Sequence, residues 1–325
     1  MNIAFAGLKH SHIFVLYNLA LQNKNFSVIG AFEDDPEYVI NAEKNGVTCN
    51  YKTFDELLND TNVDVVALGG YFGERGSMAI KALNAGKHVI ADKPLCTSQK
   101  ELKKIKKAAE QSGKKVSCMF TMRFDEPKIS AAKKLFESGA LGEINNVIFG
   151  GQHPLQYGRR PMWYFKDGMH GGVINDIAIH AIDILSYAFG LKVQTINTAR
   201  CWNKYASEQP LFKDSGQIML TAQNGAGIMG DVSYSIPDGV EFTYPNYWRF
   251  QIFGTLGVLD FSLAGADSVY YLKGDPTPHI LPAGETLNYL DDFYNLINGE
   301  SNVMLTPDEV FEATETTLKI QKASK

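Results

Sequence analysis

The feature that most constrains the fold is a regular alternation of short apolar runs and amphipathic segments in the first 120 residues. Apolar runs at 2–6, 27–32 and 63–68 end at glycine or polar residues, as buried strands do, and the segments between them place apolar residues at helical spacing. Strands that alternate with helices are joined by right-handed crossovers into one parallel sheet. The sequence therefore predicts an α/β fold that starts with a doubly wound, Rossmann-type domain over residues 1–121.

After residue 122 the pattern changes to short strands in succession. Two helices, at 130–138 and 173–189, accompany strands expected at 143–150, 193–200, 216–221, 225–235, 247–253 and 257–261. Successive short strands favour an open, mainly antiparallel sheet whose helices cover one face. Residues 122–305 are thus predicted to form a second, α+β domain. A last helix within 306–325 is expected to pack back on the first domain.

The charge balance limits the kinds of partner. A net charge of -5 and an isoelectric point near 5.8 argue against nucleic acid, whose binding depends on clustered lysine and arginine. The one basic run, at 100–115, alternates with apolar residues at helical spacing, which is typical of a solvated helix face. No apolar run reaches the roughly 20 residues of a membrane-spanning helix, and the first strand lacks the basic flank of a leader. We expect neither nucleic acid nor a membrane as partner.

The cysteines indicate the compartment. Cys49, Cys96, Cys118 and Cys201 are far apart in the sequence and show neither the paired spacing of a metal site nor a dense disulfide framework. Free thiols in a reducing compartment are the simplest interpretation. The protein is therefore expected to be cytoplasmic.

A dinucleotide-binding loop is expected after the first strand, where a Gly-x-Gly-x-x-Gly pattern makes a tight turn and approaches a pyrophosphate. Only Gly7 of that pattern is present, because Lys9 and His12 occupy the other two glycine positions. The helix that follows still offers amide groups and a positive dipole end to a phosphate. Lys9 either adds charge to this site or is a solvated loop lysine. The cofactor-binding residues expected here are Gly7, Leu8, Lys9, His10, Ser11, His12 and Ile13.

Three adjacent carboxylates, Glu33, Asp34 and Asp35, follow the second strand. Glu33 stands close to the position at which an acidic residue accepts hydrogen bonds from the adenosine ribose. The three charges together would repel the extra 2′-phosphate of NADP. The sequence thus predicts NAD as the preferred cofactor, with an acidic turn before Pro36 as the alternative interpretation.

Two later segments carry more specific information. The segment at 85–95, AGKHVIADKPL, resembles the Gly-Lys-His-Val…Glu-Lys-Pro signature of the Gfo/Idh/MocA oxidoreductases. The segment at 171–183, GGVINDIAIHAID, resembles the Gly-Gly…Asp-x-x-x-His-x-x-Asp helix of the same family. Together with GALGEI at 139–144, these segments occur in order and cover most of the chain.

The resemblance implies a Rossmann domain that binds NAD(P), an open C-terminal sheet, and hydride transfer at an alcohol carbon of a sugar, polyol or inositol. In that family the lysine of the Lys-Pro pair and the aspartate and histidine of the helix carry the chemistry. These residues correspond to Lys93, Asp176 and His180.

The chain departs from the family pattern at three places. Asp92 replaces the usual glutamate, the glycine loop is eroded, and Gly69-Gly70-Tyr71-Phe72 stands where many relatives have a Thr-Pro-x-x-His-like turn. The first departure leaves catalysis plausible, whereas the other two bear on cofactor affinity and substrate geometry. Gly69, Asp92 and Lys93 complete the expected cofactor site.

The segment at 173–189 can also be interpreted without the family. On an α-helix, Asp176, His180 and Asp183 fall on one narrow stripe, and the apolar residues lie broadly opposite. The helix is predicted to bury one face and present the polar stripe on the other. By pattern alone this stripe favours a solvated face. The paired glycines before it, which permit close backbone approach, and the family resemblance favour a functional stripe instead. No His-Glu-x-x-His motif or cysteine pair accompanies it, so we expect no metal site.

The predicted roles follow from the chemistry of alcohol oxidation, which needs a base for the hydroxyl proton and stabilisation of the developing alkoxide. His180 fits the base, and Lys93, at the carboxyl end of a strand, fits the stabilising cation. Asp176 either holds the substrate hydroxyl or tunes His180. Further substrate-pocket candidates, each of which could instead join the two domains, are Arg123, Tyr157, Arg159, Arg160, Trp163 and Tyr164.

Two other functions remain open at this point. One is a catalytically weakened regulatory homologue that binds NAD or another ligand, since one fold serves many functions. The other is a glycosidase or lyase that oxidises its substrate transiently with NAD. A homodimer or homotetramer is expected through the C-terminal sheet, because its uncovered face needs a partner, with apolar-rich strands at 218–221 and 247–253.

Overall fold

The computed structural model describes residues 1–265 and 268–324 of the chain. The described residues fall into two compact units. The first comprises Met1–Met119, Gly168–Gly171 and Asn288–Glu315. The second comprises Phe120–Asp167, Gly172–Leu287 and the residues from Thr316 onward.

The first unit is built on a parallel sheet with the strand order β3-β2-β1-β4-β5-β6. Its strands are β1 (Asn2–Ala6), β2 (Ser27–Phe32), β3 (Cys49–Tyr51), β4 (Val65–Leu68), β5 (His88–Ala91) and β6 (Val116–Cys118). The order reverses between β1 and β4, which is where doubly wound sheets bind ligands at the carboxyl ends of their strands. This topology confirms the predicted Rossmann-type fold.

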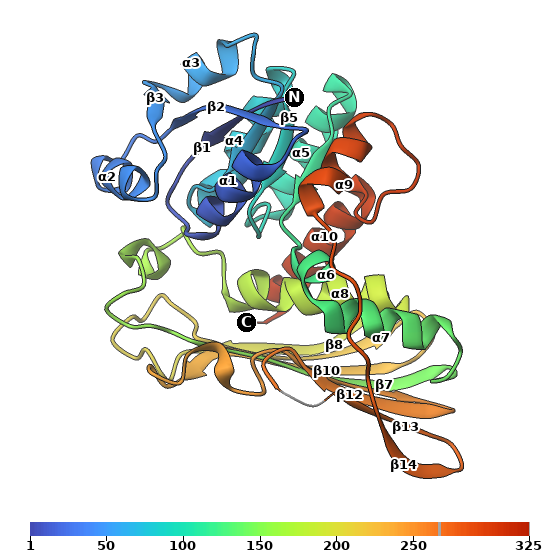
Figure 1. Cartoon of the computed structure of the whole chain (residues 1–325). Helices are drawn as coiled ribbons and strands as arrows, with labels where there is room; N and C mark the ends of the chain where they lie inside the picture. Colours follow the sequence, from blue (N-terminus) through green and yellow to red (C-terminus); the bar gives the residue numbers. More distant parts are fainter. Residues whose placement is uncertain (266–267, 325) are drawn as a thin grey trace. The chain divides into compact units, whose positions relative to one another are not determined.

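Helices pack around this sheet (Figure 1). They are α1 (His12–Gln22), α2 (Pro36–Lys44), α3 (Phe54–Asn59), α4 (Phe72–Asn84), α5 (Gln99–Ser112) and α9 (Tyr289–Ile297). Helix α5 shows how local sequence sets the boundaries, because the Ser98 hydroxyl accepts from the Glu101 amide and Gly113 ends the helix in the left-handed conformation. Its buried residues are Leu102, Ile105 and Ala108, so the lysine-rich run is the outer face that the sequence predicted.

The carboxyl-terminal part of the chain is divided differently from the prediction. Helix α9 was not expected, although its stripe of Tyr289, Leu290, Phe293 and Leu296 is buried in the first unit. Asp291 accepts hydrogen bonds from the side-chain amides of Asn23 and Asn25 at 2.8 and 3.0 Å, which ties α9 to the turn before β2. Helix α10 (Pro307–Ala323) belongs to the first unit up to Glu315 and to the second from Thr316. The structure thus assigns 288–305 to the first unit and the end of α10 to the second.

The second unit contains an eight-stranded sheet with the order β14-β13-β12-β11-β7-β10-β9-β8. The strands are β7 (Ile144–Pro154), β8 (Val193–Trp202), β9 (Ser215–Ala222), β10 (Gly227–Ile236), β11 (Arg249–Gly254), β12 (Gly257–Ser262), β13 (Val269–Leu272) and β14 (Asp275–Ile280). Only β7 and β10 pair in parallel; the other neighbours are antiparallel. The predicted open, mainly antiparallel sheet is confirmed.

Helices cover one face of this sheet, where α7 and α8 lie side by side (Figure 1). The helical segments are α6 (Met122–Asp125), α7 (Pro127–Glu137), a 3-10 turn at Met162–Phe165, a π-helical turn at Ile174–Ala178, α8 (Ile179–Phe189) and a second 3-10 turn at Glu241–Thr243. Val147 and Phe149 of β7 are buried, whereas Ile148 between them is exposed. This alternation marks one packed face and one open face of the sheet.

Three strands escaped the sequence analysis. One is β3, a three-residue strand at the edge of the first sheet. The other two lie in the second unit. β13 and β14 form a hairpin at the edge of the sheet, and β14 contains Pro276 and Pro278. Proline cannot donate a ladder hydrogen bond, so a proline-containing segment is usually excluded from a strand prediction. An edge strand tolerates it, because one side of the strand needs no donors.

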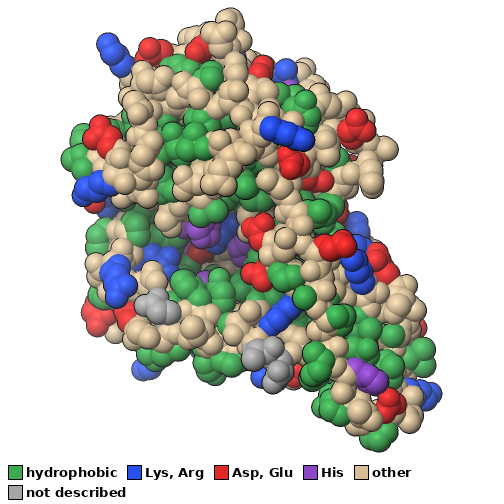
Figure 2. Space-filling view, in the orientation of Figure 1, with side chains coloured by type: hydrophobic (Ala, Val, Ile, Leu, Met, Phe, Trp, Pro, Cys, Tyr) green, Lys and Arg blue, Asp and Glu red, His purple; other side chains and the backbone are tan. Residues whose placement is uncertain are grey.

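The surface carries both signs of charge. On the face shown in Figure 2, acidic and basic side chains are interspersed over both units. Within the ranges that the structure describes, no helix combines the length and apolar character needed to cross a membrane.

Candidate active site

The loop after β1 is held close to the turn after β4. Gly7 has a φ of 71°, and a Cβ there would lie 2.6 Å from the backbone nitrogen of Gly70, so only glycine fits both the turn and the approach. The Leu8 amide donates to Glu33 Oε2 at 2.5 Å, and the amides of Lys9 and His10 donate to the Gly69 carbonyl at 3.2 and 3.1 Å. The glycine pair at 69–70 therefore gives the loop a close partner although two loop glycines are missing.

Lys9 is not the solvated loop lysine that was one of its two interpretations. Its buried ammonium lies 3.3 Å from Glu33 Oε1, 2.8 Å from Asp34 Oδ1 and 3.4 Å from Glu74 Oε1, and 4.4 Å from the centre of the Tyr71 ring. Burial by itself lowers the pKa of Lys9, but the hydrogen bond to Asp34 and the surrounding carboxylates raise it above its ordinary value. Lys9 is thus a fixed cation that neutralises part of the acidic cluster.

Two carboxylates after β2 differ sharply in exposure. The Glu33 side chain is 0% exposed, and its Oε1 accepts the amides of Asp34 and Asp35 at 3.0 Å each. Burial raises the pKa of Glu33, against the opposing effect of the Leu8 and Asp35 amides and of Lys9. The Asp34 side chain is 68% exposed, and its hydrogen bond from Lys9 lowers its pKa. Asp35 accepts from the Glu37 amide and caps α2, which is the turn role considered for this segment.

The end of β5 carries a buried cluster around Asp92. His10 Nδ1 lies 2.5 Å from Asp92 Oδ2, and His12 Nδ1 lies 3.3 Å from Asp92 Oδ1. Arg75 donates to Asp92 Oδ2 at 2.7 Å. Burial lowers the pKa of His10 to about 3, whereas the positive charge of Arg75 and the two imidazoles hold the pKa of Asp92 well below its usual range despite its burial. His10 is therefore neutral and Asp92 ionised near neutral pH.

Arg75 also positions the backbone on either side of the cluster. It donates to the Lys93 carbonyl at 2.5 Å and to the Gly70 carbonyl at 2.9 Å, which links the ends of β5 and β4. Lys93 itself is buried, and its bond to Pro94 is cis. The sequence analysis missed Arg75, because an arginine within a helix gives no signal that its guanidinium turns inward.

A second missed residue is His170, which belongs to the first unit although most of its sequence neighbours do not. The Phe72 ring lies 5.2 Å from the ring of His10 and 5.5 Å from that of His170. The Gly73 amide donates to the Met169 carbonyl at 2.9 Å. The short segment Gly168–Gly171 is thus tied to the start of α4.

In the second unit, the predicted helix at 173–189 starts with a π-helical turn. This turn, Ile174–Ala178, contains Asp176, and α8 begins at Ile179, just before His180. Asp176, His180 and Asp183 are all buried, so the stripe is not the solvated face that the pattern alone favoured. Tyr234 of β10 contacts Asp176 and Trp248 packs on His180, which the local pattern could not reveal. Single π turns in helices are frequent at functional sites.

The paired glycines before this turn do permit a close approach, and the partner is Gln321 of α10. A Cβ on Gly172, whose φ is 99°, would lie 2.3 Å from the Gln321 side chain. Gln321 Oε1 accepts the amides of Ile174 and Asn175 at 3.0 and 3.1 Å. A side chain from the far end of the sequence thus satisfies the first amides of the π turn.

Asp176 is held by a tyrosine that the sequence analysis did not name. Tyr234 of β10 donates its hydroxyl to Asp176 Oδ2, and burial together with the Asp176 charge raises the Tyr234 pKa well above its ordinary value. The Arg160 guanidinium lies 4.7 Å from the Tyr164 ring centre and 5.4 Å from that of Tyr234. Arg160 also donates to the Leu155 carbonyl at 3.0 Å. Arg160 and Asp176, both predicted, are therefore brought into one cluster.

His180 packs against Trp248, with ring centres 5.6 Å apart. His153 approaches the same indole at 5.6 Å. Trp248 is buried with a φ of 61°, a conformation that bulky residues rarely adopt, and a Cβ on Gly151 would lie 2.8 Å from its ring. Strained residues of this kind cluster at functional sites.

The other predicted substrate residues are distributed differently. Arg123 is buried and forms a two-pronged ion pair with Asp183, with its guanidinium 4.5 Å from the Tyr187 ring centre. Trp163 is buried against Tyr164, at 4.2 Å between ring centres. Tyr157 is exposed, and its hydroxyl accepts from the Gln209 side chain at 2.9 Å. Arg123 has the environment of a structural residue rather than of a substrate ligand.

Two family models match the chain. Residues 1–120 match the model described as an oxidoreductase family with an NAD-binding Rossmann fold, and residues 129–260 match the GFO/IDH/MocA C-terminal domain. The chain belongs to the Gfo/Idh/MocA family of oxidoreductases. The two matched ranges lie in the two units that carry Lys93 and the pair Asp176 and His180.

Two curated Gfo/Idh/MocA relatives illustrate the range of similarity. Levoglucosan dehydrogenase of Pseudarthrobacter phenanthrenivorans is 26% identical over 73% of this chain and 65% of its own length. The NAD(+)-dependent scyllo-inositol 2-dehydrogenase of Bacillus subtilis is 29% identical over 62% of this chain and 56% of its own length. The chain thus spans under two thirds of the length of these relatives.

Solved structures show how widely the fold is shared. A protein from Erwinia carotovora atroseptica SCRI1043 is 24% identical and superposes with a TM-score of 0.90, covering 100% of this chain and 99% of that chain. At this identity the likeness concerns the fold. The shared fold therefore extends over the whole length of this chain, including the segments 85–95 and 171–183 that carry the family signature.

Proposed function

We propose that the protein is an NAD-dependent oxidoreductase that transfers a hydride between the cofactor and a hydroxyl-bearing carbon of a sugar, polyol or inositol-like substrate. The observation that carries the proposal is the presence of all three family chemistry residues in buried, positioned settings. Lys93 follows β5 of the Rossmann unit, and Asp176 and His180 lie on the π turn and α8 of the second unit. Relatives named as dehydrogenases of levoglucosan and scyllo-inositol support the substrate class.

The first unit fits a dinucleotide at the level of its fold. Gly7 turns the chain at the carboxyl end of β1, next to the switch point of the sheet, and α1 begins at His12. Bound NAD would supply the hydride acceptor. We assign the cofactor site to residues 7–13, Glu33, Gly69, Asp92 and Lys93.

Residues of the chain would accept the substrate hydroxyl proton and stabilise the negative charge that develops on the substrate oxygen. His180, packed on Trp248, would take the substrate hydroxyl proton, and the Lys93 ammonium would stabilise the developing alkoxide. Asp176, which accepts from Tyr234, would orient the hydroxyl or His180. Because the raised pKa of Tyr234 keeps its hydroxyl protonated, it remains a donor that fixes the Asp176 carboxylate. Arg160 is the best remaining substrate candidate, since it lies over Tyr164 and Tyr234 in that cluster.

We further propose a preference for NAD over NADP. Glu33, Asp34 and Glu74 place three carboxylates around the single ammonium of Lys9, so the cluster keeps an excess of negative charge that would repel a 2′-phosphate. Because Glu33 is buried, Asp34 is the accessible carboxylate for a ribose hydroxyl. We therefore include Asp34 beside Glu33 in the proposed ribose contact.

One observation favours the alternative of a weakened regulatory homologue. The amides of Leu8, Lys9 and His10 already donate to Glu33 and to the Gly69 carbonyl. A loop whose amides are used internally has fewer donors for a pyrophosphate. An NAD-dependent glycosidase or lyase would use the same residues and differ only in its products.

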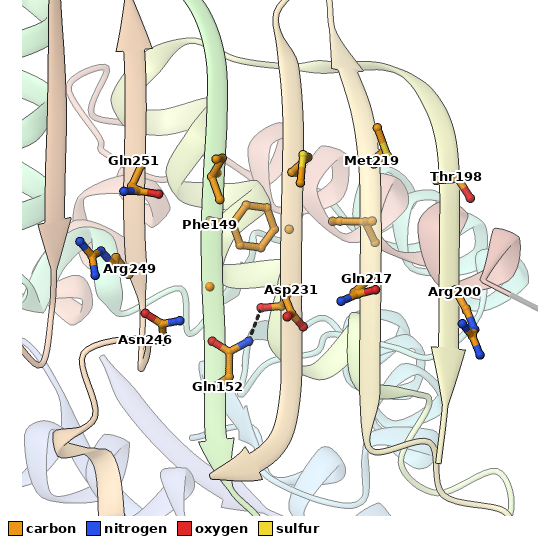
Figure 3. Close-up of a pocket in the computed structure, with 15 residues that line it drawn as sticks. Phe149, Gln152, Thr198, Arg200, Gln217, Met219, Asp231, Asn246, Arg249 and Gln251 are labelled. Carbon is orange, nitrogen blue, oxygen red and sulfur yellow. Dashed lines mark hydrogen bonds between the residues drawn. The ribbon is translucent and has the colours of Figure 1, made fainter. Parts of the chain in front are cut away.

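The oligomer proposed is a homodimer or homotetramer assembled through the open face of the eight-stranded sheet. Figure 3 shows polar side chains of β7, β8, β9, β10 and β11 standing on this face, including a hydrogen bond from Gln152 to the Asp231 carbonyl. Exposed Ile148, Met219 and Met229 lie among them. Ile218, Leu220, Phe250 and Ile252, on the strands that motivated the prediction, are buried on the packed face instead. A monomeric mass by light scattering at micromolar concentration would reject this assembly.

A cytoplasmic location is proposed from the same features as before. Cys49, Cys96, Cys118 and Cys201 are all free thiols, and burial raises the pKa of Cys96 to about 12, which makes it unreactive. Free thiols are typical of reducing compartments.

The decisive experiment for the function is a screen of polyols, inositols and sugars with NAD, read by the absorbance of reduced cofactor. Stoichiometric NADH formation with an oxidised product supports a dehydrogenase. A hydrolysed or eliminated product without net NADH would indicate the glycosidase or lyase. Binding of NADH without turnover of any candidate would favour the regulatory homologue.

A further inference from the structure

Three potential metal ligands meet in the first unit at a place where the sequence contains no metal motif. His10 and His12 stand at the start of α1, and Asp92 follows β5, 80 residues further along the chain. Each offers one ligand atom, and the three atoms lie within 4.8 Å of one another. Motif spacing detects ligands that are close in sequence, so this set becomes visible only in the fold (α1 and β5 in Figure 1).

We propose that His10, His12 and Asp92 form a binding site for a divalent transition-metal ion of the zinc class. Two imidazoles and one carboxylate are a ligand set suited to Zn²⁺, Co²⁺ or Fe²⁺. Mg²⁺ and Ca²⁺ prefer oxygen ligands and bind poorly to imidazole nitrogen. Three protein ligands leave at least one coordination position open.

The distances agree with this ligand set. Metal–ligand bonds of roughly 2.0–2.1 Å place neighbouring donors of a tetrahedral ion about 3.3 Å apart. His12 Nδ1 and Asp92 Oδ1 are separated by 3.3 Å. His10 Nδ1 lies 2.5 Å from Asp92 Oδ2, the other oxygen of the same carboxylate, and would have to separate from it by under about 1 Å if the ion bound through both oxygens.

The surroundings provide the supports that metal sites need. Arg75 donates to Asp92 Oδ2 and fixes the carboxylate, and the Phe72 ring packs on His10 at 5.2 Å between ring centres. The His12 side chain is 48% exposed, so solvent has access to the site. The charge of Arg75 opposes a cation and weakens binding, whereas Lys9 is neutralised by its own carboxylates. We therefore expect affinity on the order of micromolar rather than nanomolar.

The test uses the full chain with any affinity tag removed and with metal stripped by a chelator. Titration with Co²⁺, followed by its visible spectrum, and with Zn²⁺, followed by calorimetry, is expected to give one ion per chain. The Co²⁺ spectrum should lack thiolate charge-transfer bands, which excludes the four cysteines as ligands. Electron paramagnetic resonance of bound Cu²⁺ should show coupling to imidazole nitrogen, a readout that needs no variant.

Two variants separate this site from other histidines. His12→Ala, at a half-exposed position, should weaken metal binding at least 10-fold with an unchanged circular dichroism spectrum. The matched control is His279→Ala, because His279 forms a similar histidine–carboxylate pair with Asp275 at 2.9 Å but belongs to no three-ligand cluster among the described residues. This control should bind the metal like the parent.

Several results would overturn the proposal. They are binding of less than a fifth of an ion per chain at millimolar metal, equal binding by His12→Ala and the parent, or thiolate bands in the Co²⁺ spectrum. In those cases the cluster serves only as a hydrogen-bonded anchor between the loop and β5. NADH affinity measured on the same stripped protein keeps this outcome separate from a failure of the proposed oxidoreductase function.

Discussion

The loop at 7–13 and the segment at 171–183 depart from expectation in opposite ways. Two of the three glycines of the loop motif are replaced, yet Gly7 keeps its left-handed turn and the loop lies against Gly69 and Gly70. The later segment keeps every motif residue, yet its backbone begins as a π turn rather than an α-helix. Motif residues thus indicate which functional side chains are present, whereas the backbone geometry around them depends on partners that lie far away in the sequence.

Those partners also differ in kind. Around the loop they are charged, since Glu33, Asp34 and Asp92 hold Lys9 and His10. Around the start of the later segment they are neutral, since Gln321 bonds the first amides and Trp248 covers His180. At its end, Asp183 pairs with Arg123. The loop should therefore respond to changes of charge, and the start of the segment to changes of shape.

The largest effect is expected at His180 of the later segment and at Lys93, which follows β5. Lys93→Ala and His180→Ala should each lower turnover by about 10²–10⁴-fold, because each removes one positioned group that acts on the substrate hydroxyl. NADH affinity should stay within a few fold. Steady-state rates on a substrate found in the screen, with NADH binding by calorimetry, give the comparison, and His279→Ala is the control.

Asp176→Asn refines this test, because asparagine keeps an oxygen that can accept the Tyr234 hydroxyl. A smaller loss than for His180→Ala is expected if Asp176 only orients its neighbours. Turnover close to the parent's for both Lys93→Ala and His180→Ala would make these positions structural and the proposed chemistry wrong.

The next effect concerns stability, since each region contains a buried arginine–aspartate pair. Arg75→Met removes the arginine partner of the buried Asp92, and Arg123→Met that of the buried Asp183, so each should cost about 3–5 kcal/mol of unfolding free energy. Only Arg75→Met should also weaken NADH binding, because Arg75 connects Asp92, Lys93 and Gly70. Urea unfolding and NADH calorimetry at low temperature measure both quantities.

The two arginine variants test whether Arg123 binds substrate and whether Arg75 supports the cofactor loop. If Arg123→Met raised the KM for substrate strongly in the folded protein, Arg123 would be a substrate ligand as the sequence suggested. If Arg75→Met left NADH affinity unchanged, the cluster at Asp92 would have no part in forming the cofactor loop.

The smallest effect is a pH dependence at His88, outside both regions. His88 Nδ1 accepts the Lys115 amide at 3.0 Å, and burial lowers the His88 pKa to about 4. The unfolded chain, with an ordinary pKa near 6.5, binds more protons between these values, so stability is fully present above about pH 6.5 and falls as the pH drops toward 4. The contribution is about 1 kcal/mol, because the ring keeps partial contact with water.

Urea unfolding at pH 4.5 and 7 can isolate this contribution. His88→Asn, which keeps an acceptor for the Lys115 amide, should reduce the loss of stability between the two pH values. An identical pH dependence in the variant and the parent would assign the effect to other groups.

The first 120 residues were largely predictable because the strands other than β3 carry their own apolar runs, whereas β3 is the short segment Cys49–Tyr51. β1 and β4 are buried along almost their whole length, so each appears in the sequence as a run of consecutive apolar residues. β14 and α9 were not found, because a strand with two prolines and a short helix in an acidic context carry contrary local signals. Their positions are set by the tertiary neighbours that they pair with or cover.

The site was predictable to the extent that it is held by motif residues. Asp176, His180 and Lys93 were named as candidates from their motifs, whereas Arg75, Tyr234 and Trp248 were not, because a buried arginine or tyrosine has no distinct sequence pattern. The same limit explains Lys9 and Arg123, whose ion-pair partners Glu33 and Asp183 lie outside any local window.

The central claim is that the first unit binds NAD although its glycine loop is eroded. Calorimetric titration of the purified protein with NADH and, separately, with NADPH tests this most directly. The account predicts binding of one NADH per chain and a weaker affinity for NADPH, because three carboxylates surround Lys9 at the end of β2. Equal or tighter binding of NADPH would contradict the assigned preference, and binding of neither nucleotide would contradict the claim itself.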